Sequence, residues 1–130
     1  MLRLYTAVIL GACLFRTAHA AGLTDVSPIP GYSCAQLALT GEQVMDPKVG
    51  IPIRDTPSRQ APAVAFASSI VLVQDPAQPT AGFVRVLRLT GQSGWIEAKW
   101  LRPWFNKFDP MARCVPSMMS NGKPGFSFTK

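Results

Sequence analysis

Twelve prolines spread over a chain of 130 residues limit what this sequence can fold into more than any other feature. Proline fixes the backbone angle φ and has no N–H group, so it disrupts the interior of a helix. The segments between the prolines are short, and several are rich in valine and isoleucine, which favour strands. The sequence therefore predicts a mainly β fold built from short strands and turns, without long helices.

The middle of the chain carries several segments with the strand pattern, in which apolar and β-branched residues are bounded by turn residues. These segments span residues 49–54, 63–67, 70–73, 83–89 and 95–97. The stretch between the third and fourth contains Asp-Pro, Gln-Pro and glycine, so we expect a loop there, and Gly-Gln-Ser-Gly at 91–94 predicts a hairpin turn. Short strands at such close spacing indicate a small barrel or sandwich.

The N-terminus has the three-part plan of a cleavable secretory signal. Arg3 supplies the positive charge, residues 4–15 form an apolar run, and Ala-His-Ala at 18–20 gives the small-x-small pattern that predicts cleavage after Ala20. The apolar run is shorter than the roughly 20 residues that a membrane-spanning helix needs. We therefore expect residues 1–20 to be removed and the remaining chain to be periplasmic or secreted, with no transmembrane helix.

Cys13 offers an alternative interpretation of the same segment. Leu-Gly-Ala-Cys at 10–13 is similar to the lipobox at which bacterial lipoproteins are cleaved and acylated, which would attach the chain to a membrane by a lipid. Cys13 comes early, however, and Leu14 and Phe15 continue the apolar run where a lipoprotein normally becomes polar. Cleavage after Ala20 is the favoured prediction, and a lipid anchor at Cys13 is the alternative.

Cleavage after Ala20 would leave Cys34 and Cys114 as the only cysteines and would remove His19, the only histidine. Two thiols in an oxidising compartment favour a disulfide between them. The alternative is a free reactive thiol, which needs an activating base or a helix terminus nearby. Without histidine, the processed chain lacks the usual acid–base residue and the commonest zinc ligand.

The acidic residues do not form a recognisable catalytic or metal site. A glycosidase needs two carboxylates about 5 to 10 Å apart, and the seven acidic residues are scattered, mostly near turns and prolines. The sequence has neither clustered metal ligands nor a glycine-rich phosphate loop at a strand-to-helix junction. We therefore expect no enzyme activity, no cofactor and no metal.

The chain is moderately basic. Its formal net charge of +6 would fall to +4 when Arg3 and Arg16 leave with the signal. A charge of this size favours anionic surfaces without specifying a partner. Nucleic acid is not expected as a partner, because no basic cluster is dense enough and export would remove the protein from it.

The two flanks of the β-rich region are predicted to be irregular. Residues 21–42 contain Ser-Pro-Ile-Pro-Gly, a turn and polyproline sequence, and a short helical turn is expected around residues 35–38. Residues 104–130 form a C-terminal extension, and Asn-Gly-Lys-Pro-Gly at 121–125 marks a turn-rich tail expected to be mobile.

The order of features in residues 49–103 resembles the bacterial SH3-like (SH3b) domain family, whose small modules are common in exported cell-envelope proteins. Arg-Asp-Thr-Pro-Ser at 54–58 matches the arginine and the proline-serine that precede a short strand in the family. Strands 70–73 and 83–86 follow in the expected order. Gly-Trp-Ile-Glu-Ala-Lys-Trp-Leu at 94–101 is similar to the family's closing motif of glycine, tryptophan and an aliphatic residue, followed by an aromatic residue and leucine.

This resemblance implies a small five-stranded SH3-like barrel over residues 43–103. In such folds, aromatic residues from neighbouring loops form shallow grooves for extended peptides. The residues expected to contribute to a ligand-binding groove are Arg54, Phe83, Arg85, Trp95, Trp100 and Trp104. We expect Trp95 and Trp100 to be largely buried, whereas the aromatic residues after Pro103 either pack the C-terminal extension onto the barrel or form an exposed recognition patch. A Cys34–Cys114 disulfide would fix both extensions to the barrel.

The resemblance implies a non-enzymatic binding module of the cell envelope, whose partner would be peptidoglycan or a peptide of an envelope protein. The alternative is a structural or assembly subunit of a periplasmic complex, in which the barrel serves only as a scaffold.

Overall fold

The structure, a computed structural model, describes residues 22–130 and is mainly β. Its strands are β1 (Asp25–Pro28), β2 (Tyr32–Leu37), β3 (Pro52–Arg54), β4 (Ala63–Phe66), β5 (Ile70–Gln74), β6 (Phe83–Leu87), β7 (Ser93–Glu97), β8 (Leu101–Pro103), β9 (Arg113–Met119) and β10 (Pro124–Thr129). A short helix, α1 (Gly41–Met45), and a 3-10 turn, η1 (Ala98–Trp100), complete these elements. None of the helices within residues 22–130 has the length and apolar character needed to cross a membrane. The predicted signal segment, with its cleavage site at Ala20 and the alternative lipid site at Cys13, lies outside the described residues.

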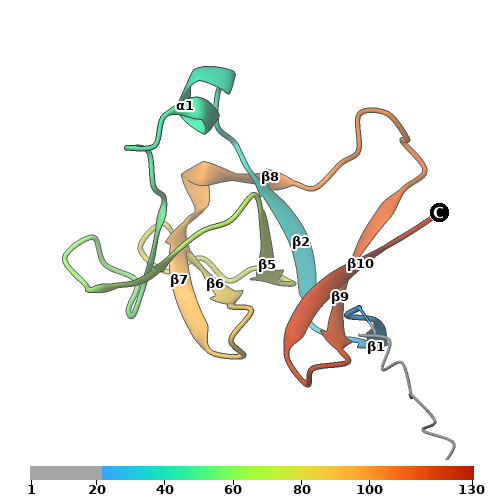
Figure 1. The fold of residues 1–130 in the computed structure, drawn as a ribbon. Coiled ribbons are helices and arrows are strands. Elements are labelled where there is room, and N and C mark those ends of the chain that lie inside the picture. The colour runs from blue at the N-terminus through green and yellow to red at the C-terminus, as the bar shows by residue number, and fades with distance from the viewer. Residues whose placement is uncertain (1–21) are drawn as a thin grey trace, which may run out of the picture.

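Seven strands form one antiparallel sheet in the order β4-β3-β7-β6-β5-β2-β8 (Figure 1). The core lies on one face of this sheet and comprises Ala35, Ile51, Ile53, Val71, Val73, Val84, Val86 and Ile96. Because β2, β3, β5, β6 and β7 all contribute to this single cluster, the sheet must curl around it. Alternation along β6 and β7 places the charged and aromatic side chains on the opposite, outer face.

A second antiparallel sheet, in the order β1-β9-β10, lies beside β2 (Figure 1). The predicted disulfide is confirmed: Cys34 on β2 is bonded to Cys114 on β9, with 6.0 Å between their Cα atoms. Cys34 pairs across the sheet with Leu72, which is only 1% exposed and does not belong to the core cluster. The disulfide therefore attaches the second sheet to the outer side of the first, on the face that also buries Leu72.

The expectation that residues 21–42 form an irregular extension is wrong. Strand β1 pairs with β9, and β2 lies between β5 and β8 within the large sheet. Instead of the helical turn expected at residues 35–38, residues 35–37 belong to β2, with Ala35 opposite Val71 on one side and Pro103 on the other. Burial of Cys34 and Ala35 requires partners for the backbone groups around them, and the two neighbouring strands supply these hydrogen bonds.

The expectation of a mobile C-terminal tail is also wrong. Strand β9 pairs with β10 over six residue pairs, and the Met119 N–H donates to the Lys123 carbonyl across the connecting turn at 2.9 Å. The turn predicted at Asn121 and Gly122 is present, and Gly122 takes the positive φ of 76° that suits glycine. The turn joins two long strands, so the Asn-Gly signal marks a hairpin rather than the start of a loose tail.

The five strands predicted in the middle of the chain correspond to β3 through β7. The five-stranded barrel is not what the structure shows, because β2 and β8 raise the number of strands in the large sheet to seven. Strands β4 and β8 are its edges, and no ladder joins them within residues 22–130. The structure thus confirms a mainly β fold with two antiparallel sheets, and the larger sheet is curled but open.

Candidate binding face

The outer face of β3, β7 and β6 brings together several of the residues predicted to bind a ligand. Trp95 on β7 lies directly opposite Arg54 on β3 and Arg85 on β6, so one row across three strands reads arginine, tryptophan, arginine. The Arg85 guanidinium lies 5.6 Å from the centre of the Trp95 ring, within the range of a cation–π contact. It also donates a hydrogen bond of 3.1 Å to the Ser93 hydroxyl. The row is therefore held by contacts of its own.

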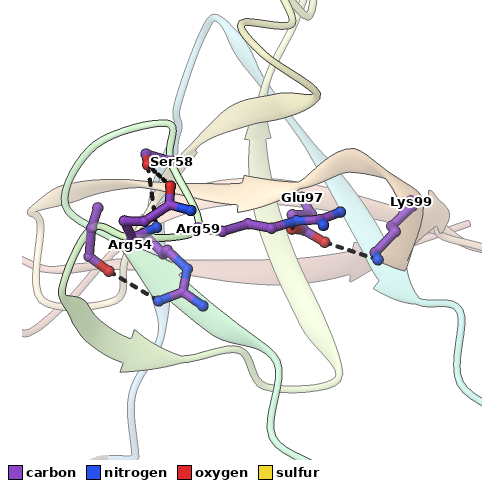
Figure 2. Close-up of polar contacts among 7 residues, drawn as sticks. Arg54, Ser58, Arg59, Glu97 and Lys99 are labelled. Carbon is purple, nitrogen blue, oxygen red and sulfur yellow. Dashed lines mark hydrogen bonds and ion pairs between the residues drawn. The ribbon is translucent and has the colours of Figure 1, made fainter.

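Arg54 connects this face to the loop of residues 55–62, between β3 and β4. Its guanidinium donates to the Ala61 carbonyl at 2.9 Å, a contact that is half-buried (Figure 2). The loop also closes on itself, because the Ser58 hydroxyl contacts the Gln60 side chain at 2.8 Å and the Ala61 N–H donates to the Ser58 carbonyl. Arg54 thus serves partly to fix the position of the loop beside the binding face.

Glu97 follows Trp95 by two residues on the same outer face and lies between two cations (Figure 2). Arg59 from the loop contacts Glu97 Oε1 at 2.5 Å through its Nε, and Lys99 contacts Oε2 at 3.2 Å. The Glu97 side chain is 16% exposed, whereas those of Arg59 and Lys99 are 68% and 57% exposed. The hydrogen bond from Arg59 is the main reason why the pKa of Glu97 lies below its ordinary value, with Lys99 acting in the same direction against the effect of burial.

Phe83 and Trp100 lie at the base of this charged group. Phe83 pairs with Glu97 across the strands and is only 4% exposed, so it forms part of the floor rather than an accessible aromatic surface. Trp100 is half-buried and lines a small hollow of about 160 Å³ together with Pro52, Arg54, Arg59, Phe83 and Glu97. Trp95 is also half-buried, so neither tryptophan is as deeply buried as expected, and each keeps part of its ring accessible.

Trp104 lies apart from this face. It follows β8, its ring stacks on Phe128 of β10 with 5.3 Å between centroids, and its backbone N–H donates to the Cys34 carbonyl at 3.3 Å. Trp104 therefore packs the C-terminal hairpin against the large sheet, one of the two roles left open by the sequence. Phe105 and Phe108 remain exposed, at 51% and 86%, and so fit the other role.

Sequence reasoning missed Arg59, Glu97 and Lys99 as part of the candidate site. The alternation in Trp-Ile-Glu could have placed Glu97 beside Trp95, because residues two apart on a strand share a face. Nothing in the local sequence places Arg59 there, since a loop residue 38 positions away in the chain makes that contact. Among residues 22–130, no group of three or more His, Cys, Asp or Glu side chains is arranged to hold a metal ion.

The face can therefore offer a ligand guanidinium and ammonium groups, an aromatic ring and a carboxylate already engaged by two cations. Such groups recognise anionic and extended ligands and provide no nucleophile with an adjacent base. No family model, no curated protein and no solved structure matches this chain.

Proposed function

We propose that this protein is an exported, non-enzymatic SH3-like binding module of the bacterial cell envelope that recognises peptidoglycan or a peptide of a partner protein. The observation that carries this proposal is the row Arg54–Trp95–Arg85 on the outer face of the sheet. A tryptophan with a partly accessible ring, contacted by the Arg85 guanidinium and flanked across the sheet by Arg54, offers stacking area and charge at one place.

The chemistry of the proposed ligand fits this row. Peptidoglycan stem peptides are extended and carry carboxylates, which arginine binds with paired, charge-assisted hydrogen bonds. Their methyl-bearing residues would cover an aromatic ring such as that of Trp95. The Cys34–Cys114 disulfide supports export, because such bonds persist in the periplasm and outside the cell.

Sedimentation with purified peptidoglycan sacculi tests the proposal. The oxidised protein should pellet with sacculi at modest salt, and Trp95→Ala or Arg85→Gln should leave most of it in the supernatant. Arg113→Gln is the matched control, because it removes the same charge from an exposed position on β9, in the other sheet. If the unmodified protein stays entirely in the supernatant, wall binding is excluded.

The second candidate function is that of an assembly subunit in a periplasmic complex. It is favoured by three exposed apolar side chains between β8 and β9, namely Phe105, Phe108 and Met111, of which Phe108 is 86% exposed. Exposed apolar residues close together in a short segment are typical of protein–protein contacts. This function predicts one fixed protein partner that co-purifies with the native chain and is lost in Phe108→Ser, while sacculus binding is absent.

A further inference from the structure

A cleft beside Glu97 adjoins the binding face and has a chemistry of its own. It has a volume of about 560 Å³ and lies between the loop 57–60, the turn 81–83 and residues 97–99. The smaller hollow lined by Trp100 shares Arg59, Phe83 and Glu97 with it, so the two lie side by side.

The cations of the cleft are only partly used by Glu97. Arg59 reaches Glu97 through Nε, and within residues 22–130 its Nη1 and Nη2 make no hydrogen bond. Lys99 makes one ion pair, with Glu97 Oε2, and its ammonium also lies 5.1 Å from the centre of the Trp100 ring. Two cations therefore share one carboxylate, so these three side chains together carry a net charge of +1. The two Nη atoms of Arg59 remain available as hydrogen-bond donors.

The walls of the cleft are small and preorganised. Its lining includes Pro57, Ala81, Gly82 and Ala98, together with the buried Phe83, and the Ala98 N–H donates to the Gly82 carbonyl. Ala81 and Gly82 both have positive φ, and the bonds of 2.8 and 2.9 Å between Thr80 and Phe83 fix them in a tight hairpin turn. Walls of this kind accept methyl-sized side chains and need little ordering when a ligand binds.

We propose that this cleft binds the free C-terminal carboxylate of a peptide whose last residues are small, with the Arg59 Nη groups on the carboxylate and Lys99 beside it. A planar guanidinium pairs with a carboxylate through two parallel hydrogen bonds. Glu97 holds Arg59 in place and limits the ligand to one negative charge, because a phosphate dianion would be repelled by the Glu97 carboxylate. The proposal rests on the proposed function and names the end of the peptide that is recognised.

Two sources supply such an end: a stem peptide that ends in D-alanine, and the C-terminus of a protein partner, built from L-residues. The shared chemistry is the free carboxylate after a small residue. Two peptides that differ only in having D- or L-alanine at the C-terminal end distinguish the sources without changing charge or composition.

Isothermal titration calorimetry on the full oxidised protein tests the proposal with Nα-acetyl-L-Lys-D-Ala-D-Ala, its C-terminal amide and the all-L peptide. We expect the acid to bind at least tenfold more tightly than the amide. Arg59→Gln should lose at least tenfold in affinity for the acid, Arg59→Lys should recover part of it, and Arg113→Gln should bind normally. The side chain of Arg59 is 68% exposed, so its replacement leaves the core untouched.

Equal binding of acid and amide, binding by Arg59→Gln at the level of the unmodified protein, or no binding of either free acid would each overturn the proposal. Tighter binding of the D-peptide assigns the site to stem peptides, and tighter binding of the all-L peptide assigns it to a protein terminus. Sedimentation with sacculi distinguishes a failure of this cleft proposal from a failure of the proposed function. Retention of the protein on sacculi without a preference for the acid refutes this cleft while the proposed function stands.

Discussion

Replacing both Cys34 and Cys114 by alanine should destabilise the protein by about 4.5 kcal/mol. The two cysteines are 80 residues apart in the chain, so the bond closes a loop of about that length in the unfolded state. The chain-entropy relation assigns such a loop about 15 cal/mol/K, which corresponds to about 4.5 kcal/mol at 25 °C. This is a large part of the 5 to 15 kcal/mol that a domain typically has.

Other contacts keep the two sheets together without the bond. Trp104 still stacks on Phe128 and still donates to the Cys34 carbonyl, and neither contact involves a sulfur atom. The double variant should therefore fold to the same structure while losing the stabilisation that the cross-link provides. A loss between about 2 and 5 kcal/mol is the range in which the reasoning holds.

Urea unfolding followed by tryptophan fluorescence measures this change for the oxidised protein, the reduced protein and the double variant. The reduced protein and the variant should unfold at similar urea concentrations, both well below the oxidised protein. A difference of less than about 2 kcal/mol between the oxidised protein and the variant would refute the argument. Free thiols at both positions in a non-reducing peptide map would refute the pairing itself.

Three further predictions concern single side chains. Gly94→Ala should cost about 1 to 3 kcal/mol in urea unfolding, because a Cβ there would lie 2.4 Å from Ile53 Cγ2, whereas Gly41→Ala has open space and should be neutral. Glu97→Gln should cost less than about 1 kcal/mol at pH 7, since its cationic partners are exposed. Because those cations lower the folded-state pKa of Glu97, this difference should be complete above about pH 5 and vanish as the pH falls through that pKa, which unfolding between pH 3 and 7 measures. Trp104→Ala should cost about 2 kcal/mol and make the C-terminal hairpin more sensitive to trypsin, with unchanged cleavage counting against its packing role.

The sequence predicted the strands of the middle region because each carries its signal locally. Residues 70–73 and 83–86 are rich in β-branched residues and bounded by turn residues, and both became strands with only small changes at their ends. The disulfide was also predictable, since the removal of Cys13 would leave only two thiols. These predictions needed no knowledge of which segments meet in space.

The flanks were mispredicted because their structure depends on distant partners. Ser-Pro-Ile-Pro-Gly reads as a loop by itself, yet β1 and β2 on either side of Pro30 are strands because β9, β5 and β8 supply their hydrogen bonds. The candidate site divides in the same way. Trp95 and Arg85 could be predicted from a motif and an alternating pattern, whereas the position of Arg59 depends on how the loop 55–62 folds back over Glu97.

The pairing of β1 with β9 also determines when this chain can finish folding. Asp25 is opposite Met119, so β1 has no partner strand until β9, near the end of the chain, has been made. Pairing between segments so distant in sequence gives a high contact order, and such proteins fold slowly. The sheet of β1, β9 and β10 therefore forms only when almost all of the chain has left the ribosome. If the chain is exported as we propose, Cys34 has no disulfide partner until Cys114 has followed it across the membrane.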